Sequence, residues 1–155
     1  MSRFSEDFSD RRKLALIIGN GNYSRRINKL DQSVRDANDM GNLLETIDFD
    51  VSTRNNISNE IMKRIQEFVD EFKVKNGDLI LFYFSGHAYQ FNNKNYLIPT
   101  DDTRVDEDED VEVFGTDVKR ILDRLMDNRP SCVVIFILDC CRSYVLKNAA
   151  TSNCK

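Results

Sequence analysis

Three apolar runs of strand length are the feature that most constrains how this chain can fold. They are Leu14–Ile18, Leu79–Phe84 and Val133–Leu138. Each run is continuously apolar and does not alternate with polar residues, which is typical of parallel strands covered by helices on both faces. Right-handed crossovers would then place the strands in one doubly wound sheet. We therefore expect an α/β fold with a mainly parallel sheet flanked by helices.

The segments between these runs have the patterns of helices and short strands. Three of them repeat apolar residues at helical spacing, namely 34–47, 61–72 and 118–126. This spacing predicts amphipathic helices. Ser58 and Thr116 are the expected N-caps of the second and third helices, and short strands are expected at 48–51 and 95–98.

A histidine and a pair of cysteines follow two of the apolar runs. His87 is the only histidine, and Cys140 and Cys141 come directly after the last run and Asp139. In open α/β sheets, sites form outside the carboxyl ends of the strands. A thiol becomes a nucleophile when a base takes its proton, and imidazole suits this role near neutral pH. This layout predicts a cysteine–histidine dyad; alternatively, His87 merely ends a strand and the cysteines are packed small hydrophobes.

Strand alternation distinguishes the two adjacent cysteines. If the pleat continues past Leu138, Asp139 and Cys141 share one face and Cys140 points to the other. Asp139 would then line the same cleft as a Cys141 nucleophile, where its carboxylate would select a cationic substrate side chain. In the alternative interpretation, Asp139 is a cap or turn residue.

Length and charge limit the number of domains and the kinds of partner that the chain can have. The 155 residues fit one domain with a sizeable core. The net charge of −4 and the lack of a basic patch argue against a nucleic-acid partner. No apolar stretch reaches the ~18 residues of a transmembrane helix, and residues 1–7 lack the apolar region of a signal peptide. We therefore expect no membrane association.

The cysteines and the acidic run carry little sign of a metal site. The four cysteines form no Cys-x-x-Cys pair, so free thiols and a cytoplasmic location are expected. With a single histidine, a structural zinc site is not expected. Residues 101–110 carry seven carboxylates and one arginine, which predicts a solvated acidic loop rather than a cation site. No cofactor is expected, and the sequence gives no support for a calcium requirement.

Four segments, in this order and spacing, carry a resemblance to a known family. They are Ala15–Tyr23, Tyr83–His87, Tyr96–Pro99 and Leu138–Arg142. Together they resemble the large catalytic subunit of the caspase, metacaspase and paracaspase clan, and most closely a paracaspase. The separation of about fifty residues between histidine and cysteine is a further signature of that clan. The resemblance runs from about Lys13 to Tyr144 and implies a caspase-like large-subunit fold.

The resemblance implies a role for each candidate catalytic residue. His87 matches the general base of the family and Cys141 its nucleophile, so the implied activity is that of a cysteine endopeptidase. The backbone N–H groups of Ala88 and Cys141 would form the oxyanion hole. The family usually has glycine where this chain has Ala88, which keeps the N–H donor but disfavours positive φ.

The resemblance also implies a substrate preference. Asp36 and Asp139 match the acidic pair with which paracaspases and metacaspases bind arginine or lysine before the scissile bond. A shift of one residue in the alignment would place Arg35 in the pocket instead of Asp36. Caspases have an arginine in this region and cleave after aspartate.

The expected organisation is a flexible lead-in at 1–12, a catalytic large-subunit domain at 13–144 and a tail at 145–155. The small-subunit region of the family is absent, so 133–138 would be an unprotected sheet edge. Self-association, or a partner that supplies strands, is therefore expected. One alternative function is a caspase-like scaffold without turnover that acts through protein–protein contacts. Another, a nucleotide-binding domain, is disfavoured because Ser24 stands where a third glycine would be needed.

Overall fold

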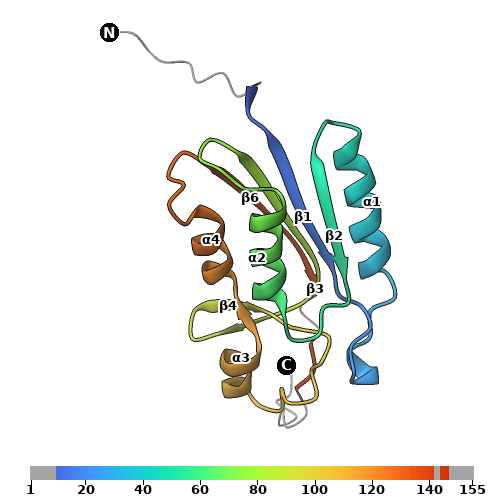
Figure 1. The fold of residues 1–155 in the computed structure, drawn as a ribbon. Coiled ribbons are helices and arrows are strands. Elements are labelled where there is room, and N and C mark those ends of the chain that lie inside the picture. The colour runs from blue at the N-terminus through green and yellow to red at the C-terminus, as the bar shows by residue number, and fades with distance from the viewer. Residues whose placement is uncertain (1–9, 142–143, 147–155) are drawn as a thin grey trace.

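The structure is a computed structural model that describes residues 10–141 and 144–146, and for Cys141 the backbone alone. Its elements in chain order (Figure 1) are β1 (Lys13–Gly19), the 3-10 turn η2 (Arg26–Asn28), α1 (Ser33–Glu45), β2 (Asp50–Asn55), α2 (Ile61–Glu71), β3 (Leu79–Phe91), β4 (Lys94–Leu97), α3 (Asp108–Phe114), β5 (Thr116–Asp117), α4 (Val118–Met126) and β6 (Val133–Cys141).

Four parallel strands form the centre of one sheet, in the spatial order β2, β1, β3, β6. The middle apolar run pairs with both of the others, because Leu14 lies opposite Ile80 and Ile80 lies opposite Val134. The predicted α/β fold with a mainly parallel sheet is therefore confirmed.

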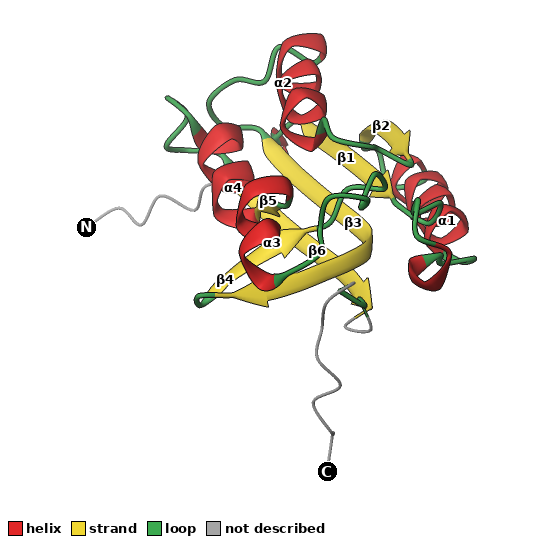
Figure 2. Ribbon diagram, turned by 90° about the horizontal axis from the view of Figure 1, so that it is seen from below, coloured by secondary structure: helices red, strands yellow, loops and turns green. Residues whose placement is uncertain are grey.

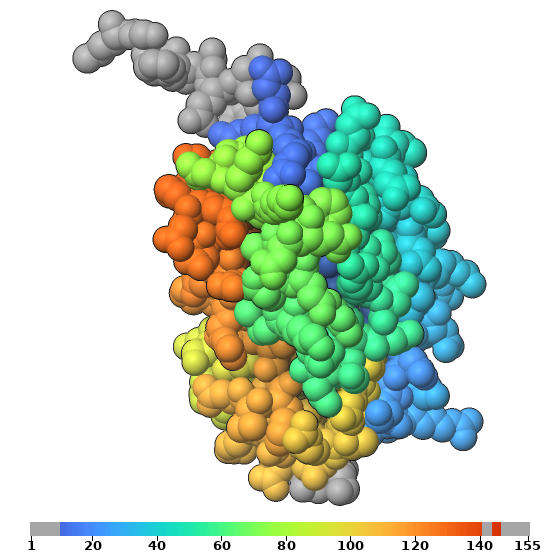
Figure 3. All heavy atoms as spheres, viewed as in Figure 1, coloured from blue at the N-terminus to red at the C-terminus, as the bar shows by residue number. Residues whose placement is uncertain are grey.

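Helices cover both faces of this sheet (Figure 2). On one face, α2 and α4 pack over a cluster that includes Leu16, Ile65 and Phe82. On the other, α1 packs over a cluster that includes Ile17 and Tyr83. Successive strand residues thus belong to clusters on opposite faces of the sheet. Burial of each aliphatic or aromatic side chain stabilises the folded state by about 1.5–3 kcal/mol. In the space-filling view, α2 and α4 form the front of the molecule (Figure 3).

Strand β3 continues well past the apolar run that predicted it. Its last part turns back through Asn92 and Asn93, which have φ values of 48° and 59°, and pairs antiparallel with β4. Two successive left-handed residues are the geometry of a tight hairpin turn. The segment around His87 therefore lies inside a strand and not in a loop that follows one, because tertiary pairing extends the strand.

Several helices and strands begin at residues other than those that the sequence predicts. Helix α2 begins at Ile61, and neither Ser58 nor the residue before the helix caps it through a side chain. Thr116 belongs to β5, and Asp117 is the cap of α4, accepting a hydrogen bond from the Lys119 N–H at 2.8 Å. Strand β2 starts at Asp50, after Asp48 has turned the chain with a φ of 66°.

The acidic run was predicted as a solvated loop, and this is wrong in two respects. Its second half forms α3, whose first turn is closed by a capping box between Glu107 and Asp110. Carboxylates near a helix N-terminus interact favourably with the helix dipole. In addition, Asp102 is completely buried.

A buried asparagine joins the loops at the carboxyl edge of the sheet. Asn20 accepts a hydrogen bond from the Ile57 N–H at 2.9 Å. Its side-chain amide donates to the carbonyls of Ile57 and Ile98, each at 3.4 Å. These hydrogen bonds hold together the loops at the edge of the sheet where the candidate site lies. Within the described part of the chain, no helix is both long enough and apolar enough to cross a membrane.

Candidate active site

His87 is buried in the middle of β3, with 1% of its surface exposed. Its Nε2 lies 2.7 Å from the carbonyl oxygen of Asn28. A carbonyl oxygen can only accept a hydrogen bond, so Nε2 carries the proton, and in the neutral imidazole the lone pair is on Nδ1. The contact therefore fixes the tautomer in which Nδ1 is the basic atom.

Two tyrosines enclose the imidazole. The ring centroids of Tyr23 and Tyr144 lie 4.7 Å and 5.3 Å from that of His87. The Tyr23 hydroxyl accepts a hydrogen bond from the His87 backbone N–H at 2.8 Å and donates to the Ile98 carbonyl at 3.3 Å. Burial raises the pKa of Tyr23 far above its ordinary value. A side chain at Gly86 would lie 2.9 Å from this hydroxyl, so the site requires glycine there.

Residues 144–146, beyond the end of β6, pack beside His87 and Asn28. Besides the ring contact of Tyr144, the Val145 N–H donates to Asn28 Oδ1 at 3.0 Å. The Asn28 side-chain amide donates to the Val145 carbonyl at 3.2 Å. Tyr144 and Leu146 are both buried. These contacts, which the sequence did not predict, add to the burial of His87 by Tyr23.

The sheet places the two candidate catalytic residues directly opposite each other. In the β3–β6 pairing, His87 is the partner of Cys141 and Ser85 is the partner of Asp139. Cys140 packs against the cluster under α2 and α4, while Asp139 interacts on the face of α1, so alternation holds up to Cys140. The side chain of Cys141 lies outside the described part of the structure.

A pocket of about 290 Å³ opens beside Gly86. Asp36 from α1 and Asp139 from β6 both line it, together with Asp31. The Tyr83 hydroxyl donates to Asp139 Oδ2 at 3.2 Å. Burial, reinforced by the Asp139 carboxylate, raises the pKa of Tyr83 to about 12. The structure thus brings the two predicted pocket carboxylates together.

The charge of this pocket is of one sign. Its described lining contains three carboxylates and no lysine or arginine. Arg35, the alternative to Asp36, is exposed and does not contribute to this lining. A cavity lined by one sign of charge attracts ligands of the opposite sign.

Ala88 presents its N–H toward the end of β6. The Ile98 N–H donates to the His87 carbonyl at 2.9 Å, which makes Ala88 and Leu97 a non-hydrogen-bonded pair of the antiparallel ladder. The Ala88 N–H consequently points away from β4, to the side on which Cys141 lies. Ala88 has no positive φ, so alanine fits this backbone without strain.

Three residues of this site were missed by the sequence reasoning: Asn28, Asp102 and Tyr144. Each acts through a contact with a residue far away in the chain, and none stands in a pattern that suggests chemistry. Of the cysteines, Cys132 is a buried free thiol whose Sγ–H donates to the Lys75 carbonyl at 3.2 Å. In the described residues, no three histidine, cysteine or acidic side chains are grouped so as to hold a metal ion.

Comparisons with known proteins point to one family. The family model described as "Caspase domain" matches residues 12–154. Human mucosa-associated lymphoid tissue lymphoma translocation protein 1 is 32% identical over 132 residues, and its mouse homologue is 29% identical over 131 residues. These matches cover 84% of this chain but span only 15% of the length of either relative.

Solved structures show the same fold. A protein from Geobacter sulfurreducens superimposes with a TM-score of 0.60 at 18% identity, covering 86% of this chain and 52% of the other. The Drosophila initiator caspase Dronc gives a TM-score of 0.59 at 14% identity, covering 80% of this chain and 47% of the other. The predicted large-subunit fold is therefore confirmed.

Proposed function

The chain belongs to the caspase-domain family, and on that basis we propose that it is a cysteine endopeptidase domain with His87 as general base and Cys141 as nucleophile. The observation that carries the proposal is the pairing of these two residues across β3 and β6. The Asn28 contact supports it further, since it leaves the lone pair of His87 on Nδ1.

In the proposed reaction, His87 Nδ1 takes the thiol proton as Cys141 Sγ attacks the scissile carbonyl. The tetrahedral intermediate then collapses, and the leaving amine departs with the proton held by His87. Water attacks the resulting thioester with His87 again as base, which releases the acid product and the free thiol. The N–H groups of Ala88 and Cys141 are the proposed oxyanion donors, and the orientation of Ala88 supports this role.

The proposed substrate has arginine or lysine before the scissile bond. Asp36 and Asp139 line one pocket beside Gly86, next to the proposed base. A guanidinium or ammonium group placed there would form charge-assisted hydrogen bonds with these carboxylates. The mechanism requires no cofactor, and we propose that the protein acts in the cytoplasm.

The proposed partners include a strand that covers β6. Among the described strands, β6 pairs only with β3, so its other edge is open. Ile135 and Leu138 on this strand are 41% and 39% exposed. An open apolar edge invites pairing with another chain, which supports either self-association or a separate small-subunit region.

A second function is favoured by one observation. His87 has 1% of its surface exposed, with the Tyr144 ring packed against it, and a base in this state cannot reach a substrate. The alternative is therefore a caspase-like scaffold that works through protein–protein contacts without turnover.

A peptidyl-arginine probe that reacts with thiols separates the two functions. With the full-length protein, we expect labelling and arginyl-peptide hydrolysis to be lost in Cys141→Ala and His87→Gln. Cys140→Ala is the matched control. Cys140 also lines the acidic pocket, but it packs against the cluster under α2 and α4, so this variant should retain most of both. Absence of labelling in the wild-type protein would support the scaffold, and loss only in Cys140→Ala would overturn the assignment of the nucleophile.

A further inference from the structure

A buried carboxylate, Asp102, lies next to the turn that contacts the proposed base. Asp102 is completely buried, and burying a carboxylate is costly unless hydrogen bonds compensate. Its Oδ1 accepts from the Arg25 backbone N–H at 2.9 Å. Its Oδ2 accepts from the Asn28 amide at 2.8 Å and from the Tyr144 hydroxyl at 3.5 Å. The carboxylate is thus held by three donors from two distant segments.

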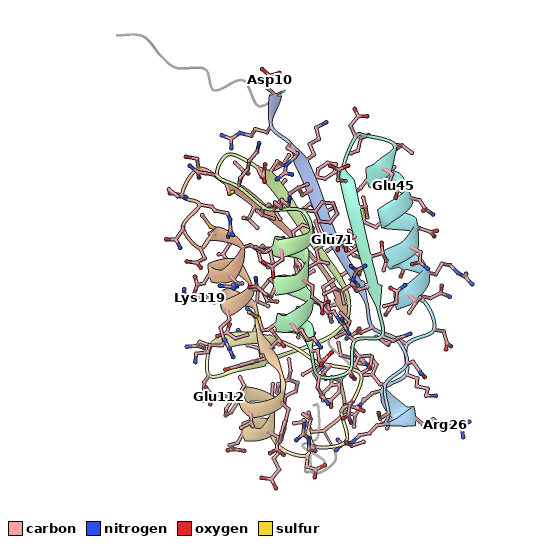
Figure 4. All side chains as sticks on the ribbon, viewed as in Figure 1. Asp10, Arg26, Glu45, Glu71, Glu112 and Lys119 are labelled. Carbon is pink, nitrogen blue, oxygen red and sulfur yellow. The ribbon has the colours of Figure 1, made fainter. Side chains whose placement is uncertain are left out.

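Two of these donors flank the same short turn. Arg25 precedes η2 and Asn28 is its last residue, and the Asn28 N–H donates to the Arg25 carbonyl at 2.9 Å, closing the turn. One carboxylate therefore clamps both ends of the turn. Between them, Arg26 projects away from the body of the molecule (Figure 4), whereas Asn28 is buried.

The clamped turn carries the carbonyl that contacts the proposed base. The Asn28 side chain bonds to Asp102, and its own main-chain oxygen lies 2.7 Å from His87 Nε2. A displacement of the turn would move this oxygen, and a hydrogen bond weakens steeply as its geometry degrades.

We infer that Asp102 is a positioning residue for His87: by clamping the turn from Arg25 to Asn28, it holds the Asn28 carbonyl on Nε2 and so keeps Nδ1 as the basic atom. Asp102 acts through Asn28 and is not itself catalytic. The catalytic meaning of this inference rests on the proposed function, whereas the contact that it describes does not.

Because His87 is the only histidine among these 155 residues, NMR of this chain labelled with ¹⁵N reports on the contact without ambiguity. In the wild-type protein, we expect a one-bond ¹H–¹⁵N signal from Nε2–H that exchanges slowly with water. In folded Asp102→Asn, which introduces an N–H₂ group and removes a charge, the exchange should be faster by about tenfold, the factor for loss of one hydrogen bond.

Asp78→Asn is the matched control. Asp78 is also buried and hydrogen-bonded, to Arg12 and to the Lys75 N–H, but at the opposite end of the strands. This variant should lose stability and keep the wild-type Nε2–H exchange. Faster exchange in Asp78→Asn as well would indicate a general loss of stability and overturn the inference.

A second variant covers the case in which Asp102→Asn does not fold. Asn28→Ala removes the amide that bonds to Asp102 but keeps the main-chain carbonyl, and it should show the same faster exchange. Wild-type exchange and ¹⁵N shifts in whichever of these two variants folds would overturn the inference. Since no substrate is involved, this result is independent of peptidase activity. If activity is present, Asp102→Asn should lower kcat with little change in KM, because Asp102 does not line the acidic pocket.

Discussion

The carbonyl oxygen of Asn28 lies 2.7 Å from Nε2 of His87, although 59 positions separate them in the chain. This single contact determines which nitrogen of the imidazole can accept a proton. It connects the turn after β1 with the middle of β3, so the chemistry of the histidine depends on how a distant turn is held.

The acidic pocket predicts a loss of activity toward arginyl peptides. Asp139→Asn or Asp36→Asn removes a carboxylate that would bind the guanidinium, and hydrogen bonds to charged groups contribute about 1.5–3 kcal/mol. We expect kcat/KM to fall roughly 10- to 150-fold, measured with a fluorogenic arginyl peptide.

Asp39→Asn is the control for this pair. Asp39 lies on the same helix as Asp36 but is exposed and does not line the pocket, so its neutralisation should change little. A wild-type protein that preferred aspartyl peptides would contradict the pocket assignment and point to Arg35.

The hydroxyl of Tyr23 predicts a defined loss of stability. Tyr23→Phe removes the acceptor of the buried His87 N–H and one of the two donors to the Ile98 carbonyl, the other being the Asn20 amide. Loss of a buried hydrogen-bond partner costs about 1–3 kcal/mol. Urea denaturation measures the free energy of unfolding. Tyr96→Phe, whose hydroxyl donates to Glu112 at the surface at 3.3 Å, should cost less. Equal losses would argue against the hydrogen bonds of Tyr23.

The raised pKa of Tyr83 predicts that the protein loses stability at high pH. Burial first, and then Asp139, raises the pKa of Tyr83 to about 12, against about 10 in an unfolded chain. The folded state therefore holds the phenol proton more tightly, so this contribution is complete below about pH 10 and is lost as the pH rises toward 12. Tyr83→Phe should make the free energy of unfolding fall less steeply over that range than in wild type, and identical slopes would rule out the contribution.

The cover over His87 predicts slow chemical modification. With 1% of its surface exposed, the single imidazole should react with diethyl pyrocarbonate much more slowly than in urea. Tyr144→Ala removes a ring that packs on His87 and should accelerate the reaction several-fold. Val145→Ala, at an exposed position of the same segment, should leave the rate unchanged. Fast modification of the folded wild-type protein would show that the cover opens readily.

Sequence patterns predicted the centre of the fold well because burial on both faces demands long apolar runs. The three runs predicted the strands, whereas the pairing of Leu14, Ile80 and Val134 is known only from the structure. The continuation of β3 past Phe84 could not be predicted, since Ser85 and Gly86 have the composition of a turn. Only pairing with β4 and β6 makes that segment a strand.

The same division holds for the candidate site. His87 and Cys141 were predicted to lie at the same edge of the sheet because each follows an apolar strand, and the resemblance added Asp36. The burial of Asp102 could not be predicted, because a carboxylate within an acidic run is expected to be exposed to solvent. Its burial depends on donors from Arg25, Asn28 and Tyr144, which meet only when the chain has folded.

The pairing of β3 with β6 also bears on how the molecule is made. Parallel pairings join segments far apart in the chain, and such long-range contacts form slowly. During synthesis, the ribosome releases β1 and the strand that bears His87 well before it releases β6. Until β6 docks, β3 has an open apolar edge, which is the stage at which a nascent chain most needs a chaperone. The proposed dyad therefore cannot exist in a partly synthesised chain that still lacks β6.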